Sequence, residues 1–159
     1  MSLTRHDLQE LMEEAVTSCL DHIEAGGIPF VGVVANDEGY VSGPGFNLVH
    51  QTRAPSAHAE IVAMRQALQD LDRTDLKGFS LLATGEPCGL CYRFALQQGI
   101  ARIYVAVDAD TAADLGFDYR ESYRALGIDR SQLTQLVTSL PVENGLEPFK
   151  RYLKRNAHI

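Results

Sequence analysis

The sequence has few of the residues that a disulfide framework, a membrane span or a polyanion-binding surface would need. It contains three cysteines among 159 residues, while 45% of its residues are hydrophobic, so a core can form without disulfide bonds. Its 14 lysines and arginines are outnumbered by 21 aspartates and glutamates, and a formal net charge of -7 gives no general attraction for nucleic acids. No apolar run is long enough to cross a bilayer. These shortages argue against a secreted disulfide-rich protein, a membrane-spanning protein and a nucleic-acid-binding protein.

The chain also shows no internal repeat, low-complexity tract or linker. Residues 1–16 mix charged with apolar residues and offer neither the apolar centre nor the cleavage site of a signal peptide. We therefore expect a cytoplasmic protein with one domain over residues 1–159. In that reducing compartment, two neighbouring cysteines more often bind metal or take part in chemistry than form a lasting disulfide.

The first half of the chain predicts a helix, a hairpin and a second helix. Apolar residues recur at helical spacing after Thr4, whose relation to Asp7 is that of a capping box, and Gly26-Gly27 ends this helix. An apolar run over 30–35, a polar turn over 36–39 and a second run beginning at Tyr40 predict a hairpin. A loop over 43–56 follows, and helical spacing resumes at Ala57.

The second half alternates strands and helices. Residues 80–84 and 102–107 are compact apolar strands separated by a helical pattern, which favours a parallel pair with a right-handed crossover. Residues 111–126 predict two short helical pieces broken near Gly116, followed by a last strand over 133–140 and a terminal helix over 146–156. The fold class is therefore α/β, with helices packed on a mixed sheet.

Two of the three cysteines lie in the stretch GEPCGLC at 85–91, where Cys88 and Cys91 fall on one face at the start of a helix. A helix N-terminus lowers the pKa of a thiol, and the thiolate is the form that binds metal. A redox dithiol, a closed structural zinc site with four protein ligands and a catalytic zinc site with three ligands are all compatible with this pattern.

The number of available ligands separates these alternatives. The remaining cysteine, Cys19, falls on the apolar stripe of the first helix and is better explained as a core residue than as a fourth ligand. His58, at the start of the second helix, can supply a third ligand beside the carboxylate of Glu60. This set predicts an open zinc site, whereas a redox pair explains neither His58 nor Glu60.

Both motifs together match the signature H-x-E followed by P-C-x-x-C of zinc-dependent nucleobase deaminases, as His58-Ala59-Glu60 and 87–91. The chain resembles the cytidine deaminase-like superfamily over nearly its full length and is most similar to bacterial guanine deaminases. The resemblance implies a three-layer α/β/α fold with a mixed five-stranded sheet and helices on both faces. It also implies one zinc ion per chain on His58, Cys88 and Cys91, with zinc-bound hydroxide as nucleophile and Glu60 as the proton carrier that helps release ammonia.

Further stretches carry the resemblance to guanine deaminases: GIPF at 27–30, PSAHAE at 55–60, the stretch 110–118 and the pair Pro148-Phe149. It implies substrate contacts by Asn47, Phe30, Ala59, Asp118 and Tyr119. Three departures affect the pocket: Ala54 replaces an Asp, Val31-Gly32 replace Gly-Ala, and Tyr119 stands where these enzymes place a second Asp that contacts the base. A phenol cannot replace that carboxylate without cost, because a buried donor left unpaired is unfavourable. A guanine-like ring is the first expectation for the substrate, and a cytosine-like ring or a triazine is the alternative.

The resemblance further implies a small nucleobase-like substrate, no nucleic-acid or membrane partner, and a homodimer whose C-terminal tails are exchanged in the family. A tRNA adenosine deaminase is an alternative, favoured by the basic residues Lys150, Arg151, Lys154 and Arg155 and disfavoured by the acidic chain. A zinc-stabilised binding protein without catalysis is a second alternative. It is disfavoured because a structural site has no use for the unliganded carboxylate of Glu60.

Overall fold

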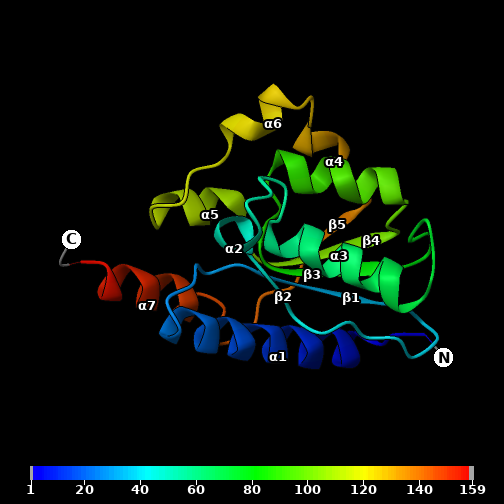
Figure 1. Ribbon diagram of the computed structural model, residues 1–159, viewed down its shortest axis with the longest axis horizontal. Helices are drawn as coiled ribbons and strands as arrows, with labels where there is room; N and C mark the ends of the chain where they lie inside the picture. Colours follow the sequence, from blue (N-terminus) through cyan, green and yellow to red (C-terminus); the bar gives the residue numbers. More distant parts are fainter. Residues whose placement is uncertain (1, 158–159) are drawn as a thin grey trace.

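A mixed five-stranded sheet forms the centre of the computed structural model, which describes residues 2–157 (Figure 1). Its strands are β1 (Val31–Ala35), β2 (Gly45–Phe46), β3 (Ser80–Gly85), β4 (Arg102–Val107) and β5 (Val137–Ser139). They follow the order β2-β1-β3-β4-β5; β1 is antiparallel to both β2 and β3, and β3, β4 and β5 are parallel. The predicted mixed sheet and the predicted parallel pair of β3 and β4 are both confirmed.

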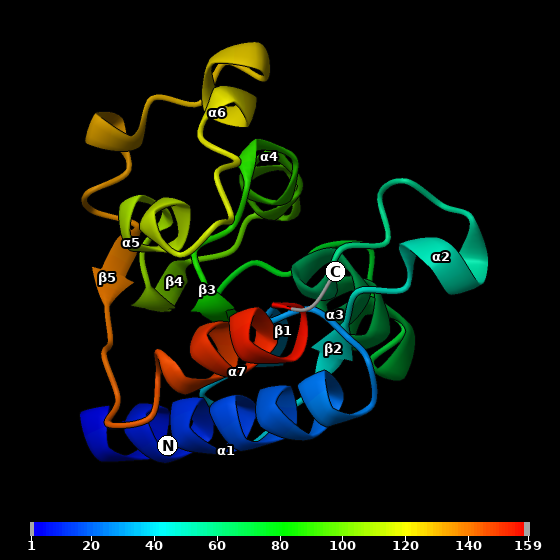
Figure 2. The same ribbon diagram turned by 90° about the vertical axis from the view of Figure 1, so that its left-hand side faces the viewer.

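Helices cover both faces of this sheet, as predicted. They are α1 (Arg5–Glu24), α2 (Val49–Thr52), α3 (Ala59–Asp70), α4 (Gly89–Gln98), α5 (Ala109–Asp114), α6 (Glu121–Ala125), the short 3-10 helix η1 (Arg130–Gln132) and α7 (Glu147–Arg155). The first and last helices, α1 and α7, lie side by side under one face, and α3 and α4 lie over the other (Figures 1 and 2). Arg151 and Arg155 of α7 pair with Glu24 at the end of α1. Each face therefore has its own apolar core.

Local sequence signals explain where several elements begin. Thr4 and Asp7 form the predicted capping box, in which the Asp7 amide donates to Thr4 Oγ1 at 3.0 Å and the Thr4 amide donates to Asp7 Oδ2 at 2.9 Å. Strand β4 occupies the residues predicted for it, and the break near Gly116 separates α5 from α6. All five residues of β1 are buried, because helices pack on both of its faces.

The predicted hairpin is wrong in its second strand. Val41 makes an isolated bridge with Ala35, but the paired strand β2 lies in the segment predicted as loop, and α2 follows in the same segment. One extra residue stands between Val41 and Gly45 relative to β1, which is a β-bulge. Ser42 causes the break, since its Oγ accepts the Val34 amide hydrogen at 2.9 Å in place of a backbone carbonyl. The last strand is also shorter than predicted, because η1 and a turn occupy the residues before Val137.

Two glycines of the sheet allow α3 to approach it closely. A Cβ on Gly32 of β1 would lie 2.8 Å from Glu60 Cα, and a Cβ on Gly45 of β2 would lie 2.4 Å from the Ala59 carbonyl oxygen. The start of α3 therefore rests directly on the backbone of the sheet. Among the described residues, no helix is long and apolar enough to cross a membrane.

Candidate active site

Two helix N-termini bring the predicted zinc ligands together. His58 is the residue before the first turn of α3, Cys88 is the residue before the first turn of α4, and Cys91 is the third residue of α4. Cys88 Sγ lies 3.4 Å from His58 Nδ1 and 3.6 Å from Cys91 Sγ, and Cys91 Sγ lies 3.5 Å from His58 Nδ1. Neither N-cap residue caps its helix through its side chain, and both N-termini direct their positive dipole ends toward this region.

The three donor atoms fit a zinc ion. A tetrahedral zinc with sulfur at about 2.3 Å and nitrogen at about 2.0–2.1 Å spaces its donors about 3.5–3.8 Å apart. The observed triangle of 3.4–3.6 Å agrees with that spacing. Among the described residues, this is the one group of three or more His, Cys, Asp and Glu side chains whose donors are close enough to share an ion. Three protein ligands leave a fourth position for water or substrate, which is the pattern of a catalytic zinc site.

Hydrogen bonds within this triad set the protonation of its three donor atoms. Hydrogen bonds from Cys91 and His58 lower the pKa of Cys88 to about 4, so this sulfur is a thiolate. The hydrogen bond to Cys88 raises the pKa of His58, while the hydrogen bond to Cys88 and burial raise the pKa of Cys91. A metal ion bound among these three donors would replace the protons that now link them.

Glu60 lies beside the triad and is not one of its donors. Its side chain is only 4% exposed, and Oε2 accepts a hydrogen bond from the Cys91 thiol at 3.2 Å. Burial raises the pKa of Glu60 to about 7, with the negative charge of Cys88 acting in the same direction. A carboxyl group with such a pKa can both take and give a proton near neutral pH.

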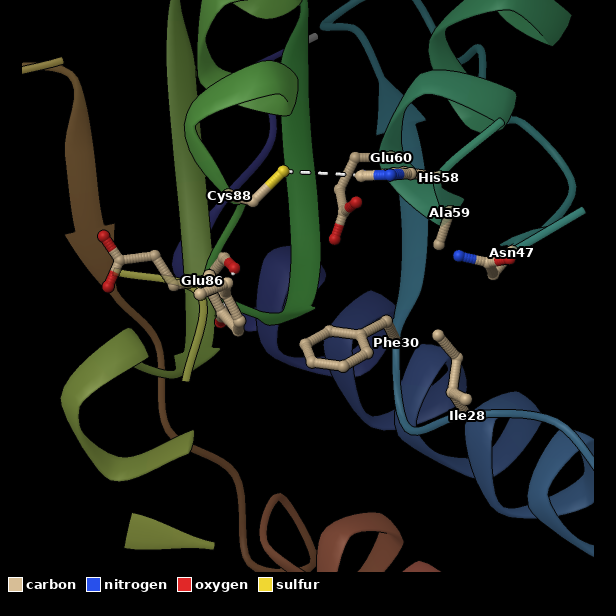
Figure 3. A pocket seen from close by; sticks show the side chains of 9 residues that line it. Ile28, Phe30, Asn47, His58, Ala59, Glu60, Glu86 and Cys88 are labelled. Carbon is tan, nitrogen blue, oxygen red and sulfur yellow. Dashed lines mark hydrogen bonds between the residues drawn. The ribbon is translucent and has the colours of Figure 1, made fainter. Parts of the chain in front are cut away.

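A cavity of about 150 Å³ opens in front of Glu60 and His58 (Figure 3). It is lined by Ile28, Phe30, Asn47, His58, Ala59, Glu60, Glu86, Cys88 and Tyr119. Figure 3 shows the Phe30 ring below the Glu60 carboxylate, and Asn47 and Ala59 on the same side as His58. The structure therefore brings all but two of the predicted site residues to the lining of one cavity; the two that do not line it are Cys91 and Asp118.

Asn47 and Phe30 are placed to contact a planar ring. Asn47 Oδ1 accepts the Val49 amide hydrogen at 3.1 Å, which leaves its NH₂ group directed into the cavity (Figure 3). The Phe30 ring makes edge-to-face contacts with Tyr119 and Phe149, with centroids 5.8 and 5.5 Å apart. These contacts hold the Phe30 ring as a wall of the cavity.

Asp118 and Tyr119 are neighbours in the chain but point in different directions. The structure does not bring Asp118 into the cavity, because its exposed carboxylate pairs with Arg120, which lowers its pKa to about 2. Tyr119 lines the cavity with its ring, and its hydroxyl donates to the Glu86 carbonyl oxygen at 2.7 Å. The phenol oxygen is therefore committed to the protein backbone.

Two lining residues, Ile28 and Glu86, were not predicted from the sequence as site residues. Ile28 lies in the stretch GIPF next to Phe30, so its position was available from the motif. Glu86 directly precedes Pro87-Cys88, and a carboxylate at the end of a buried strand was a usable signal.

Cys19 is a core residue, as predicted. It is fully buried in α1 on the opposite face of the sheet from the triad, and burial raises the pKa of its thiol to about 12. We expect Cys19→Ser to retain one zinc ion per chain and to lose about 1–3 kcal/mol of stability, since a hydroxyl replaces an apolar thiol. Zinc content by atomic emission and a thermal melt measure both effects. Cys91→Ser, which removes a ligand, is the comparison, and a loss of zinc in Cys19→Ser as large as in Cys91→Ser would contradict the three-ligand site.

Comparison with known proteins gives a consistent set of relatives. Residues 5–107 match the family described as the cytidine and deoxycytidylate deaminase zinc-binding region. The chain is 28% identical over 145 residues to the guanine deaminase of Bacillus subtilis, covering 91% of this chain and 92% of that protein. It is 33% identical over 111 residues to a tRNA-specific adenosine deaminase of Haemophilus influenzae, covering 69% of this chain and 64% of that protein.

Solved structures share the fold. The structure of NE0047 in complex with 2,6-diaminopurine has a TM-score of 0.77 and 26% identity, with 96% of this chain and 84% of that chain covered. A guanine deaminase from Nitrosomonas europaea has a TM-score of 0.71 and 26% identity, with 89% and 81% covered. The predicted three-layer α/β/α architecture is therefore confirmed.

Proposed function

Because this chain belongs to the cytidine and deoxycytidylate deaminase zinc-binding family, we propose that it hydrolyses the exocyclic amine of a free, guanine-like base and releases ammonia. That the chain is a zinc-dependent aminohydrolase of the nucleobase deaminase type follows from its family and its guanine deaminase relatives. The observation that carries the finer proposal is the cavity of about 150 Å³ that Glu60 lines together with His58 and Cys88 of the metal triad.

His58, Cys88 and Cys91 would hold the zinc ion in this proposal. Two thiolates and one neutral imidazole offset the charge of the ion, and the donor spacing fits it. When bound, zinc supplies the Lewis acidity that makes a water molecule nucleophilic near neutral pH.

Glu60 moves the protons. Hydrolysis adds water at the carbon that bears the amine, and the amine then leaves with an additional proton as ammonia. Glu60 takes one proton from the attacking water and gives it to the ring nitrogen. It then takes the remaining proton of the added hydroxyl and gives it to the amine, so that the carbon–nitrogen bond breaks, the carbonyl forms and ammonia leaves. Its burial suits this role, because its raised pKa makes both directions of transfer accessible near neutral pH.

Asn47, Phe30 and the start of α3 orient the ring. The Asn47 NH₂ group donates to a ring carbonyl or ring nitrogen, and the Phe30 ring packs against the base. Ala59 is the first residue of the uncapped helix α3, and its small side chain leaves room at the cavity wall. Such positioning contributes to rate because the reacting carbon must lie next to the attacking water.

A guanine-like ring is supported by the relatives. Guanine deaminases appear among both the sequence and structural relatives, and NE0047 was crystallised with 2,6-diaminopurine and a mutant of it with 8-azaguanine. Tyr119 limits this support, because its hydroxyl is bonded to the Glu86 backbone and offers no carboxylate to ring N–H groups. A cytosine-type or triazine-type ring is therefore the second candidate.

A tRNA substrate is less well supported by the charge distribution. Of the basic residues of α7, Arg151 and Arg155 already pair with Glu24 of α1, so they are partly neutralised. The whole chain is acidic, which opposes phosphate binding.

We expect the homodimer, the cytoplasmic location and the single domain over residues 1–159 on the basis of the resemblance and composition. Size-exclusion chromatography with light scattering tests the dimer.

A panel of amine-bearing rings tests the proposal. We expect zinc-loaded protein to release ammonia from guanine, and to act on cytosine, ammeline-like triazines and a tRNA at least about tenfold more slowly; a tenfold preference corresponds to about 1.4 kcal/mol. Coupled detection of ammonia with each compound provides the measurement, and metal-stripped protein is the control. Ammonia release only from cytosine or only from a triazine would identify that ring as the substrate. Ammonia release from none of the compounds would favour a zinc-stabilised binding protein.

A further inference from the structure

The carboxylate of Glu86 lies directly before the zinc-ligand turn and is held by three separate elements. Its side chain is 6% exposed. Oε1 accepts from the Ala109 amide at 2.8 Å and from Arg130 Nη2 at 2.7 Å, while Oε2 accepts from the Tyr92 hydroxyl at 2.6 Å and from Arg130 Nε at 3.1 Å. Four donors satisfy both oxygens, so this carboxylate is fixed in position.

Arg130 is the positive partner of this carboxylate. Two of its nitrogens bind both Glu86 oxygens in a planar fork, which is the most specific geometry for an arginine–carboxylate pair. Its guanidinium lies 5.1 Å from the centroid of the Tyr123 ring and 3.4 Å from Asp110. Arg130 thus ties the start of η1 to the residue that enters the zinc-ligand turn.

The backbone of the same turn is held by the segment 119–123. The Tyr119 hydroxyl donates to the Glu86 carbonyl, and the Tyr123 hydroxyl donates to the Pro87 carbonyl, both at 2.7 Å. The Gly89 amide donates to Ser122 Oγ at 2.8 Å. These bonds leave the turn that carries Cys88 little freedom, because its polar backbone groups have partners outside the helix that follows.

Apart from Tyr92 and the Val107 carbonyl, which accepts the Glu86 amide hydrogen at 2.8 Å, the groups that hold this turn lie beyond the region that matches the family. That region ends at residue 107, whereas Ala109, Tyr119, Ser122, Tyr123 and Arg130 all follow it. The ligands are therefore shared with the family, and their support comes from a later part of this chain.

We propose that Arg130 is a positioning residue for the metal centre, which acts by clamping Glu86 and thereby fixing the spacing of the Cys88 and Cys91 sulfurs. The proposal rests on the zinc binding that underlies the proposed function. It does not rest on the identity of the substrate. Groups that orient metal ligands commonly affect metal affinity or activity 10- to 100-fold when they are removed.

The test compares Arg130→Met with Arg120→Met. Both arginines pair with Asp110, but only Arg130 reaches Glu86. We expect Arg130→Met to weaken zinc binding at least about tenfold in competition with a chelator. We also expect it to shift the cobalt(II) absorption bands of the cobalt-substituted protein, because these bands report the geometry of the two sulfurs. Arg120→Met is expected to match the unmodified protein in both measurements.

The double variant Glu86→Gln/Arg130→Met separates positioning from simple destabilisation. It leaves no unpaired buried charge, so we expect its melting temperature to recover while zinc binding stays weak. Recovery of both zinc affinity and the cobalt spectrum in the double variant would overturn the proposal, as would an equal loss in Arg120→Met. Metal binding is measured without substrate. The zinc and cobalt measurements therefore test the role of Arg130 even if the proposed deamination is not found.

Discussion

Replacement of Glu60 by glutamine is expected to leave zinc bound and to lower turnover of the accepted base about 10²- to 10⁴-fold. Glutamine has nearly the same shape, so it can occupy the buried site at the start of α3 without displacing the metal ligands. It cannot take a proton from water and return it to the leaving amine. Steady-state kinetics with the accepted base and zinc content by atomic emission measure the two effects.

Glu121→Gln is the matched control, since Glu121 occupies the first turn of α6, is exposed and lies outside the cavity. We expect it to keep full turnover and full zinc content. Turnover of Glu60→Gln within a few-fold of the unmodified enzyme would refute the proton-carrier role. Loss of zinc in Glu60→Gln would instead assign Glu60 to the support of the metal.

Replacement of Gly32 by alanine is expected to displace the start of α3 and to affect both stability and catalysis. The added Cβ would meet Glu60 Cα at 2.8 Å, which is closer than real side-chain contacts allow. Strand β1 is paired on both sides and cannot move away, so α3 must shift. We expect a loss of about 1–3 kcal/mol in unfolding free energy from overpacking, and a fall in kcat of about 10²-fold, as an ångström-scale displacement of a catalytic group produces.

Gly43→Ala tests whether this effect comes from the contact and not from the loss of a glycine. A Cβ at Gly43 meets nothing within 4 Å, and Gly43 has no positive φ. Denaturant unfolding and kinetics on both variants give the comparison. Equal behaviour of the two variants would show that α3 does not depend on contact with Gly32.

The metal centre was predictable because chemistry restricts it strongly. His58, Cys88 and Cys91 are residue types that bind zinc, they lie in two short motifs, and the third cysteine belongs to an apolar helical stripe. Helix starts were predictable for a related reason, since caps such as Thr4 with Asp7 act within four residues. For the metal centre, few residues of the chain can act as ligands. For the helix starts, the interacting residues are close together in the sequence.

Long-range pairing was not predictable in the same way. Arg130 lies 44 positions from Glu86, and nothing near Arg130 in the sequence distinguishes it from other surface arginines. The bulge before β2 depends on Ser42 binding the Val34 amide, a side-chain contact across the hairpin. Asp118 and Tyr119 diverge because the direction of each side chain follows from the turn between α5 and α6. These features depend on tertiary geometry.

The aromatic support of Phe30 has a consequence for how the protein matures. Phe149 of α7 is fully buried against Phe30, and α7 also pairs with α1 through Glu24. A ribosome adds roughly 5–20 residues per second, so Phe149 emerges several seconds after His58, Cys88 and Cys91. The metal ligands are thus available in the growing chain before the cavity wall has its support. The residues that hold the zinc-ligand turn, up to Arg130, also emerge before Phe149, so completion of the substrate pocket is the later event during synthesis.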